Sequence, residues 1–173
     1  ILARQAESCE RWHDMALLTR RLAIVTRGQF SREERNLFAI AHKHVLMPHR
    51  QALRVLSQNY VHPATLRLSQ DYRKHIEYEL KTFCQSLAEF VCTHLLEKTL
   101  ELPDHRVFFL KFVGDMYRYI AELNPIRDND ACRLCRSYYH DAALLAERCM
   151  NITSPIRLGL LLNYAVAAFE LFR

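Results

Sequence analysis

The hydrophobic residues of this chain recur at the spacing of α-helices. Between residues 31 and 57 the apolar positions lie three or four residues apart, which places them on one helical face. They are Leu37, Ile40, Ala41, Val45 and Leu46. Ser31 precedes this run and Glu34 comes three residues after Ser31, which is the pattern of a capping box. The pattern therefore predicts a helix that begins at Ser31 and ends near Ser57.

The same periodicity predicts helices along most of the chain. The N-terminal thirty residues favour two short helices, with a break near Arg11 or Trp12 and an end by Gly28. Longer helices are expected over residues 64–96, 108–123, 128–149 and 154–172. In the last of these, Ser154 is the expected N-cap and Pro155 the first helical residue. About seven helices joined by short loops predict an all-α fold, an antiparallel helical bundle.

The composition supports a helical, globular protein. The 173 residues include only three glycines and five prolines, whereas sheets, hairpins and phosphate-binding loops consume glycine. The sequence has no run of about 18 uncharged apolar residues, so we expect no membrane-spanning helix and no membrane partner. The six cysteines lack the spacing of a disulfide scaffold, which favours a reducing compartment and predicts a cytoplasmic protein.

The net charge of +5 is only a weak indication of an anionic partner. The basic residues are interleaved with nineteen acidic ones and form no block rich in lysine and arginine. A helical protein that binds nucleic acid is therefore a distant hypothesis, because only the net charge supports it. We expect no nucleic-acid partner.

The sequence contains no recognisable catalytic machinery. Gly-x-Ser-x-Gly turns, phosphate loops and His-Glu-x-x-His motifs are all missing from it, so we expect a protein that is not an enzyme. Cys132 and Cys135, with His140 and Cys149 nearby, are either metal ligands or simple thiols. The sequence has no second close pair at zinc-finger spacing, which favours thiols. We therefore expect no metal and no cofactor.

A line of alternating charges marks the helix predicted over residues 108–123. Lys111, Asp115, Arg118 and Glu122 lie within roughly 60° of one another on a helical wheel. This spacing is typical of a solvent-exposed ladder of ion pairs. It also suits one half of a binding site, and the helix alone does not distinguish the two.

A second line, on the helix that begins at Ser31, consists only of cations. Lys43, Arg50 and Arg54 lie within about 40° on the wheel, and no acidic residue between positions 36 and 70 can pair with them locally. Three cations in this arrangement indicate an anionic ligand. Pro48 lies among them and is expected to kink the helix, because it removes one backbone hydrogen bond.

The last predicted helix is almost entirely apolar from Leu158 to Phe172, and its polar exceptions include Asn163 and Glu170. Polar groups on such a helix need partners. Neighbouring helices could satisfy both residues, or solvent could satisfy Glu170. Alternatively, the two residues line a groove, and the pattern favours neither reading.

Four longer segments resemble the 14-3-3 family in both order and spacing. They are EERNLFAIAHKHV (33–45), DYRKHIEYEL (71–80), VFFLKFVGDMYRYIAEL (107–123) and SPIRLGLLLNYAV (154–166). Together they extend the resemblance over essentially the whole chain. The resemblance implies a helical protomer with a cup-like amphipathic groove. Family members bind phosphoserine or phosphothreonine peptides there, without catalysis and usually as dimers.

The resemblance also implies which residues form the groove. The phosphate pocket would consist of Lys43, Arg50, Arg118 and Tyr119, with Arg54 and Lys111 beside it. The last helix would contribute Leu162, Asn163, Val166 and Glu170. In this arrangement the asparagine holds the ligand backbone, the glutamate lies near the basic residues, and the two apolar side chains belong to the hydrophobic wall.

A homodimer is implied as well, in which the N-terminal helices pack against the third and fourth helices of the partner. Arg11 would pair with Glu79 of the partner subunit, and Tyr72 would belong to the same interface. Asp14 would face His75 of the partner subunit, where the family usually has a lysine. Because histidine is only partly charged near neutrality, this second pair would depend on pH.

The chain also departs from the family pattern. The family has two further helices after the position of Phe172, so the single domain over residues 1–173 is expected to be incomplete at its C-terminal end. Pro48 adjoins the implied phosphate pocket. These departures keep an alternative open, a 14-3-3-like dimerisation or scaffold module whose groove is degenerate and does not bind.

Overall fold

The computed structural model describes residues 1–58, 65–99, 102–124 and 129–172. Within these ranges the chain forms seven α-helices and one short 3-10 turn, and it contains no β-strand. The elements are α1 (Leu2–Ser8), α2 (Trp12–Val25), α3 (Arg32–Gln58), α4 (Leu66–His94), η2 (Leu96–Lys98), α5 (Pro103–Leu123), α6 (Asp130–Cys149) and α7 (Pro155–Leu171). The predicted all-α fold is confirmed.

The helix boundaries agree with the sequence pattern at most ends. Helix α5 contains the whole stretch 108–123 that was expected to be helical and begins five residues before it, at Pro103. Proline suits the first helical position, where its missing N–H would have had no partner in any case. The starts predicted at residues 64 and 128 lie outside the described residues, and α4 and α6 are seen from Leu66 and Asp130.

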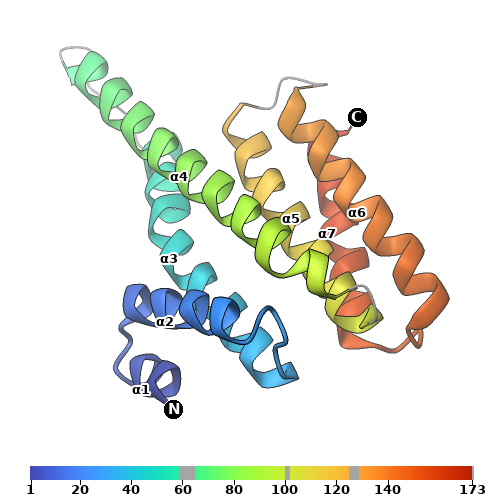
Figure 1. Ribbon diagram of the computed structural model, residues 1–173. Coiled ribbons are helices and arrows are strands. Elements are labelled where there is room, and N and C mark those ends of the chain that lie inside the picture. The colour runs from blue at the N-terminus through green and yellow to red at the C-terminus, as the bar shows by residue number, and fades with distance from the viewer. Residues whose placement is uncertain (59–64, 100–101, 125–128, 173) are drawn as a thin grey trace.

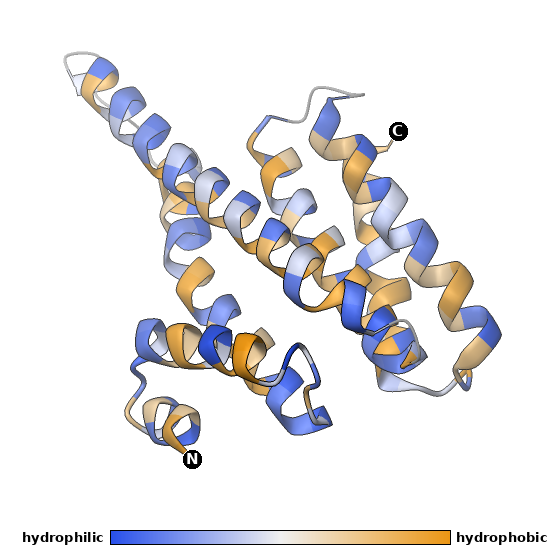
Figure 2. Ribbon diagram, viewed as in Figure 1, coloured by the Kyte–Doolittle hydropathy of each residue, from blue (hydrophilic) through white to orange (hydrophobic). Residues whose placement is uncertain are grey.

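Helix α5 occupies the centre of the bundle, since it contacts α3, α4, α6 and α7. Figure 1 shows α1 and α2 lying across the N-terminal half of α3, away from α6 and α7. Figure 2 shows that the long helices have an apolar side and a hydrophilic side, as their periodicity predicts. None of the described helices has both the length and the apolar character needed to cross a membrane.

The capping box predicted at the start of α3 is present. The backbone N–H of Ser31 donates to Oε2 of Glu34 at 2.8 Å, and the backbone N–H of Glu34 donates to the hydroxyl of Ser31 at 3.2 Å. At the start of α7, Ser154 occupies the N-cap position as predicted, but its side chain makes no capping hydrogen bond. Pro155 at the first helical position leaves one backbone donor fewer to satisfy there.

Helix α3 continues through Pro48 to Gln58 without interruption. Proline has no N–H, so the carbonyl oxygen of His44 lacks its usual helical donor at this point. The helix therefore carries Lys43, Arg50 and Arg54 along one continuous element.

The core gathers around Phe38 of α3, which is fully buried. Its ring lies within 6.3 Å, centroid to centroid, of four other phenylalanine rings, those of Phe30, Phe90, Phe109 and Phe112. Truncating such a residue to alanine typically costs about 3–5 kcal/mol of stability. This aromatic cluster fixes α3 against α4, which carries Phe90, and against α5, which carries Phe109 and Phe112.

A buried histidine joins α2 to the same region. His42 lies one turn after Phe38, and its Nδ1 donates to the carbonyl oxygen of Phe38 at 2.7 Å. Its Nε2 accepts a hydrogen bond from Nε of Arg20 at 3.1 Å. Burial lowers the pKa of His42 to about 3, so the ring is neutral at physiological pH and the tautomer is the one that these two bonds require.

Candidate functional site

The two charged lines predicted from the sequence face each other across α3 and α5. Nη2 of Arg50 lies 2.8 Å from Oε2 of Glu122, although 72 positions separate the two residues in the chain. The other oxygen of the same carboxylate accepts a hydrogen bond from Nη1 of Arg118. Glu122 therefore bridges the guanidinium groups of two helices.

Tyr119 lies between these two guanidinium groups. The centroid of its ring is 4.0 Å from Cζ of Arg50 and 4.6 Å from Cζ of Arg118, which are cation–π distances. Burial raises the pKa of Tyr119, and the negative charge of Asp115 adds to this effect. The phenol therefore keeps its proton and can donate a hydrogen bond.

Asp115 forms a second centre, at the meeting point of α5, α6 and α7. Its Oδ1 accepts hydrogen bonds from the hydroxyl of Tyr139 and from Nδ2 of Asn163, the latter at 2.7 Å. Its Oδ2 accepts from Nζ of Lys111 at 2.8 Å. The hydroxyl of Tyr139 in turn accepts from Nε of Arg118 at 3.2 Å. These bonds connect the two centres into one network.

The network contradicts the simple solvated ladder that the spacing on α5 also allowed. Asp115 is 8% exposed and Arg118 is 9% exposed. Burial by itself would lower the pKa of Arg118. The negative charge of Glu122 and the other neighbouring groups raise the pKa by more than burial lowers it, so the guanidinium stays charged. A buried cation that remains charged needs such partners.

We use the name cation cluster for Lys43, Arg50, Arg54, Lys111 and Arg118. Two carboxylates, Asp115 and Glu122, pair with members of the cluster. The five cations therefore exceed the two carboxylates by three positive charges. Lys43 and Arg54 are exposed, and neither forms a hydrogen bond or ion pair with any residue in the described ranges.

A pocket lies between α3 and α5 at this cluster, with a volume of about 160 Å³. Its walls are both basic and apolar and include Lys43, Met47, Arg50, Phe108, Lys111 and Tyr119. Apolar lining with a few charged groups at the edge is typical of ligand sites.

Of the four residues predicted on α7, only Asn163 forms a hydrogen bond with the network. The side chain of Asn163 donates a hydrogen bond to Asp115, so a neighbouring helix supplies the partner that this polar residue of an apolar helix needs. Leu162 and Val166 lie on the exposed side of the helix, 65% and 37% exposed. Glu170 is exposed and forms no ion pair within the part of the chain that the structure describes.

The residues predicted at a dimer interface lie at the surface, and four of the five are paired within the chain. Arg11 forms an ion pair with Asp14, three positions away. Nε2 of His75 lies 3.4 Å from Oε1 of Glu79. Tyr72 is 59% exposed.

The predicted thiols are buried, and the structure gives no sign of a metal centre in the described ranges. Cys132 and Cys135 lie in the core of α6, and no disulfide is formed among the cysteines. No group of three or more histidine, cysteine or acidic side chains in the described part of the chain is arranged to hold a metal ion.

Sequence reasoning missed Tyr139 and Gly114. A Cβ built on Gly114 would lie 2.9 Å from the ring of Tyr139, so the glycine lets α6 approach α5 closely enough for the tyrosine to reach Asp115 and Arg118. The signal was a glycine inside a strongly helical segment, where glycine costs about 1 kcal/mol relative to alanine. Such a residue often marks a close approach.

The two helical glycines provide a matched test of this approach. We expect Gly114→Ala to destabilise the protein by about 1–3 kcal/mol, because the new methyl group overlaps the Tyr139 ring. Gly159→Ala should be neutral or stabilising, since its Cβ would meet nothing nearer than Cε of Lys111 at 3.9 Å. Urea unfolding of both variants measures the difference. Equal stabilities would contradict the role given to Gly114.

Comparison with known proteins identifies the family of this chain. The family model described as 14-3-3 protein matches residues 2–173. Mouse 14-3-3 protein theta is 35% identical over 175 residues, covering 98% of this chain and 70% of its own length. Chicken 14-3-3 protein beta/alpha is 35% identical with the same coverage, and 14-3-3 protein homolog 2 of Echinococcus multilocularis is 32% identical, with 98% and 69% covered. The chain belongs to the 14-3-3 family.

Proposed function

We propose that this protein is a non-catalytic adaptor that binds phosphoserine- or phosphothreonine-containing segments of client proteins at the cation cluster. One observation carries the proposal. Arg50 and Arg118 are held around Tyr119 by the shared carboxylate of Glu122, and the surrounding cluster keeps three positive charges in excess. A cluster of this kind has the chemistry of a site for a doubly charged oxyanion.

The donors of the cluster suit a phosphate group. A phosphorylated residue carries about 1.5 to 2 negative charges at neutral pH and offers three acceptor oxygens. Arg50 and Arg118 provide forked donors, Lys43 a point charge, and Tyr119 a neutral hydroxyl. Each charge-assisted hydrogen bond contributes roughly 1.5–3 kcal/mol, so a few of them are enough to distinguish phosphoserine from serine.

Fixed arginine side chains also reduce the entropic cost of binding. A long side chain that becomes immobile on binding costs about 0.5–1.5 kcal/mol. Arg118 is already buried, and Arg50 is held by Glu122 and the Tyr119 ring. Much of the side-chain entropy is therefore already lost on folding and is not lost again on binding.

The other predicted residues fit supporting roles in a bound peptide. The amide nitrogen of Asn163 donates to Asp115, which leaves its carbonyl oxygen to accept a backbone N–H of the peptide. Leu162 and Val166 are exposed and suit apolar contacts with residues beside the phosphate. Lys111 stands at the edge of the pocket, and Glu170 suits a basic residue of the client.

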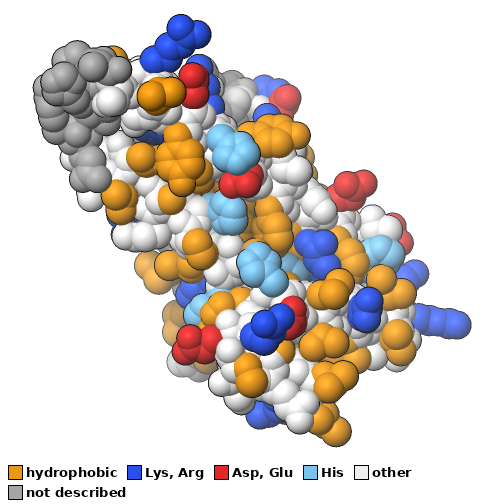
Figure 3. Space-filling view, turned by 90° about the vertical axis from the view of Figure 1, so that its left-hand side faces the viewer, with side chains coloured by type: hydrophobic (Ala, Val, Ile, Leu, Met, Phe, Trp, Pro, Cys, Tyr) orange, Lys and Arg blue, Asp and Glu red, His pale blue; other side chains and the backbone are white. Residues whose placement is uncertain are grey.

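We also propose that the protein forms a homodimer through α1 and α2 of one protomer and α3 and α4 of the other. The side of the molecule shown in Figure 3 exposes hydrophobic and histidine side chains close together. Exposed apolar residues on α2, α3 and α4 include Leu17, Val55 and Tyr72. Dimerisation would exchange the ion pairs Arg11–Asp14 and His75–Glu79 within each chain for pairs between chains.

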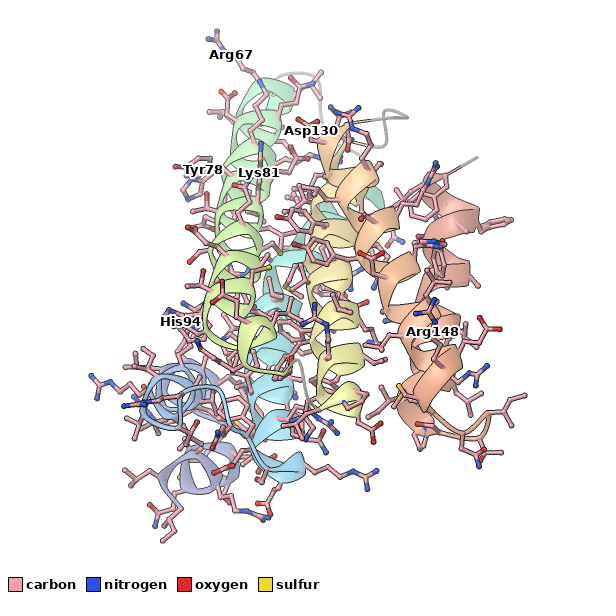
Figure 4. All side chains as sticks on the ribbon, turned by 45° about the vertical axis from the view of Figure 1, so that its right-hand side comes forward. Arg67, Tyr78, Lys81, His94, Asp130 and Arg148 are labelled. Atoms are coloured by element: carbon pink, nitrogen blue, oxygen red, sulfur yellow. The ribbon has the colours of Figure 1, made fainter. Side chains whose placement is uncertain are left out.

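Binding of a fluorescent phosphoserine peptide tests the adaptor function. We expect micromolar or tighter binding, and binding at least tenfold weaker for the unphosphorylated peptide. Lys43→Glu and Arg50→Glu should each weaken binding at least tenfold, because they place a negative charge against the phosphate. Arg67→Glu is the matched control, since Arg67 is an exposed cation at the N-terminal end of α4 and lies outside the cation cluster (Figure 4).

Equal binding of both peptides would contradict the proposal. So would charge reversals at Lys43 and Arg50 that changed binding no more than the reversal at Arg67. A dimer that bound no phosphopeptide would instead support the degenerate scaffold module.

Sedimentation equilibrium tests the dimer. We expect a dimer at micromolar concentration, and Glu79→Lys should raise its dissociation constant about tenfold by placing a cation opposite Arg11 of the partner subunit. Glu89→Lys is the control, because Glu89 is an exposed acid on the same helix. A monomeric protein, or equal effects of the two substitutions, would overturn the proposed interface.

A further inference from the structure

A second pocket adjoins the phosphate-binding part of the cation cluster. It lies between α3, α4 and α5 and has a volume of about 220 Å³. It shares Arg50 and Arg54 with the cluster, and Tyr119 and Glu122 also line it. Its remaining charged lining consists of Arg73 and Glu77. We call it the Arg54 pocket.

The carboxylates of the Arg54 pocket already have cationic partners. Oε1 of Glu77 accepts from Nε of Arg73 at 2.7 Å. Both oxygens of Glu122 are bound by arginines, as described above. Arg54 is exposed and makes no hydrogen bond or ion pair with any residue that the structure describes. Three arginines and two glutamates leave one positive charge in excess at the pocket, and Arg54 carries it.

A bound phosphate does not neutralise the whole region. The cation cluster exceeds its carboxylates by three charges, whereas a phosphorylated residue supplies about 1.5 to 2 negative charges. Roughly one cation thus remains without a counter-charge when phosphoserine is bound. Arg54 lies farther along α3 from Lys43 than Arg50 does. Arg54 is therefore the cation that a phosphate bound beside Lys43 and Arg50 leaves without a counter-charge.

The floor of the pocket is apolar. Leu53 and Leu80 are buried, 9% and 1% exposed, and Leu123 joins them in the lining. A side chain with a hydrocarbon stem and an anionic end fits this combination, because the stem covers the leucines while the charged end meets the guanidinium.

The spacing of the two arginines sets the distance between the two anions. Arg50 and Arg54 lie one helical turn apart, about 6 Å along the axis. In an extended peptide, residues two positions apart point to the same side and lie about 6.6 Å from each other. A second anionic residue two positions from the phosphoserine would therefore reach Arg54.

We propose that the Arg54 pocket is a subsite for a second anionic side chain of the client, located two residues from the phosphorylated one. The ligand group is a carboxylate or a second phosphate, which share the chemistry that Arg54 recognises. This inference rests on the proposed phosphopeptide function. It makes Arg54 a residue that selects among phosphorylated clients.

Fluorescence anisotropy with one parent phosphoserine peptide and its variants tests the subsite. The parent carries alanine two residues before and two residues after the phosphoserine. Each of these positions is replaced in turn by glutamate, phosphoserine or lysine. At one of the two positions we expect glutamate to tighten binding about threefold to tenfold, phosphoserine to tighten it at least as much, and lysine to weaken it.

The ratio of affinities between the glutamate and alanine peptides is the quantity that reports on Arg54. In Arg54→Gln this ratio should fall to near one, whatever happens to the parent peptide. In Arg148→Gln, which also removes one exposed arginine of the protein, the ratio should persist, because Arg148 lies on α6 and does not line the pocket (Figure 4). Phosphoserine gaining affinity while glutamate gains none would restrict the subsite to phosphate and overturn its carboxylate arm.

Two results overturn the subsite outright. One is the absence of any gain at either position while the parent peptide still binds. The other is a gain that survives Arg54→Gln. Failure of the parent phosphopeptide itself to bind would instead contradict the proposed function.

Discussion

The candidate site depends on one interaction, the pairing of the Glu122 carboxylate with both Arg50 and Arg118. Two arginines from different helices would repel each other around one tyrosine ring unless an anion lay between them, and Glu122 supplies it with one oxygen for each. The same contact links α3 to α5 at a point where Arg118 is almost completely buried. Leaving such a cation unpaired typically costs about 3–5 kcal/mol, so fold and site share this requirement.

Because α5 lies at the centre of the bundle, its carboxylates also connect the other helices. Asp115 and Glu122 lie seven residues apart on one face of α5, so Asp115 accepts hydrogen bonds from α6 and α7 while Glu122 accepts one from α3. Gly114, beside Asp115, admits the Tyr139 ring that completes the network. The cations of the cluster outnumber these two carboxylates, and Lys43 and Arg54 are its members without an ion pair to any residue that the structure describes.

The sequence predicted the local features well because they depend on neighbouring residues. Helical periodicity, the capping box of Ser31 and Glu34, and the two lines of charge all follow from spacing within a few turns. The pairing of Arg50 with Glu122 and the role of Tyr139 did not follow, since they join residues on different helices whose packing only the fold defines. The roles given to groove residues came from the family resemblance rather than from helix geometry.

The most direct test of the central claim is the affinity of Glu122→Gln for a phosphoserine peptide, measured by calorimetry. The substitution keeps the shape of the side chain but removes a negative charge beside the cations. If Glu122 positions Arg50 and Arg118 for the phosphate, affinity will fall several-fold even though the site becomes more positive. Tighter binding, as simple charge attraction requires, would contradict the account.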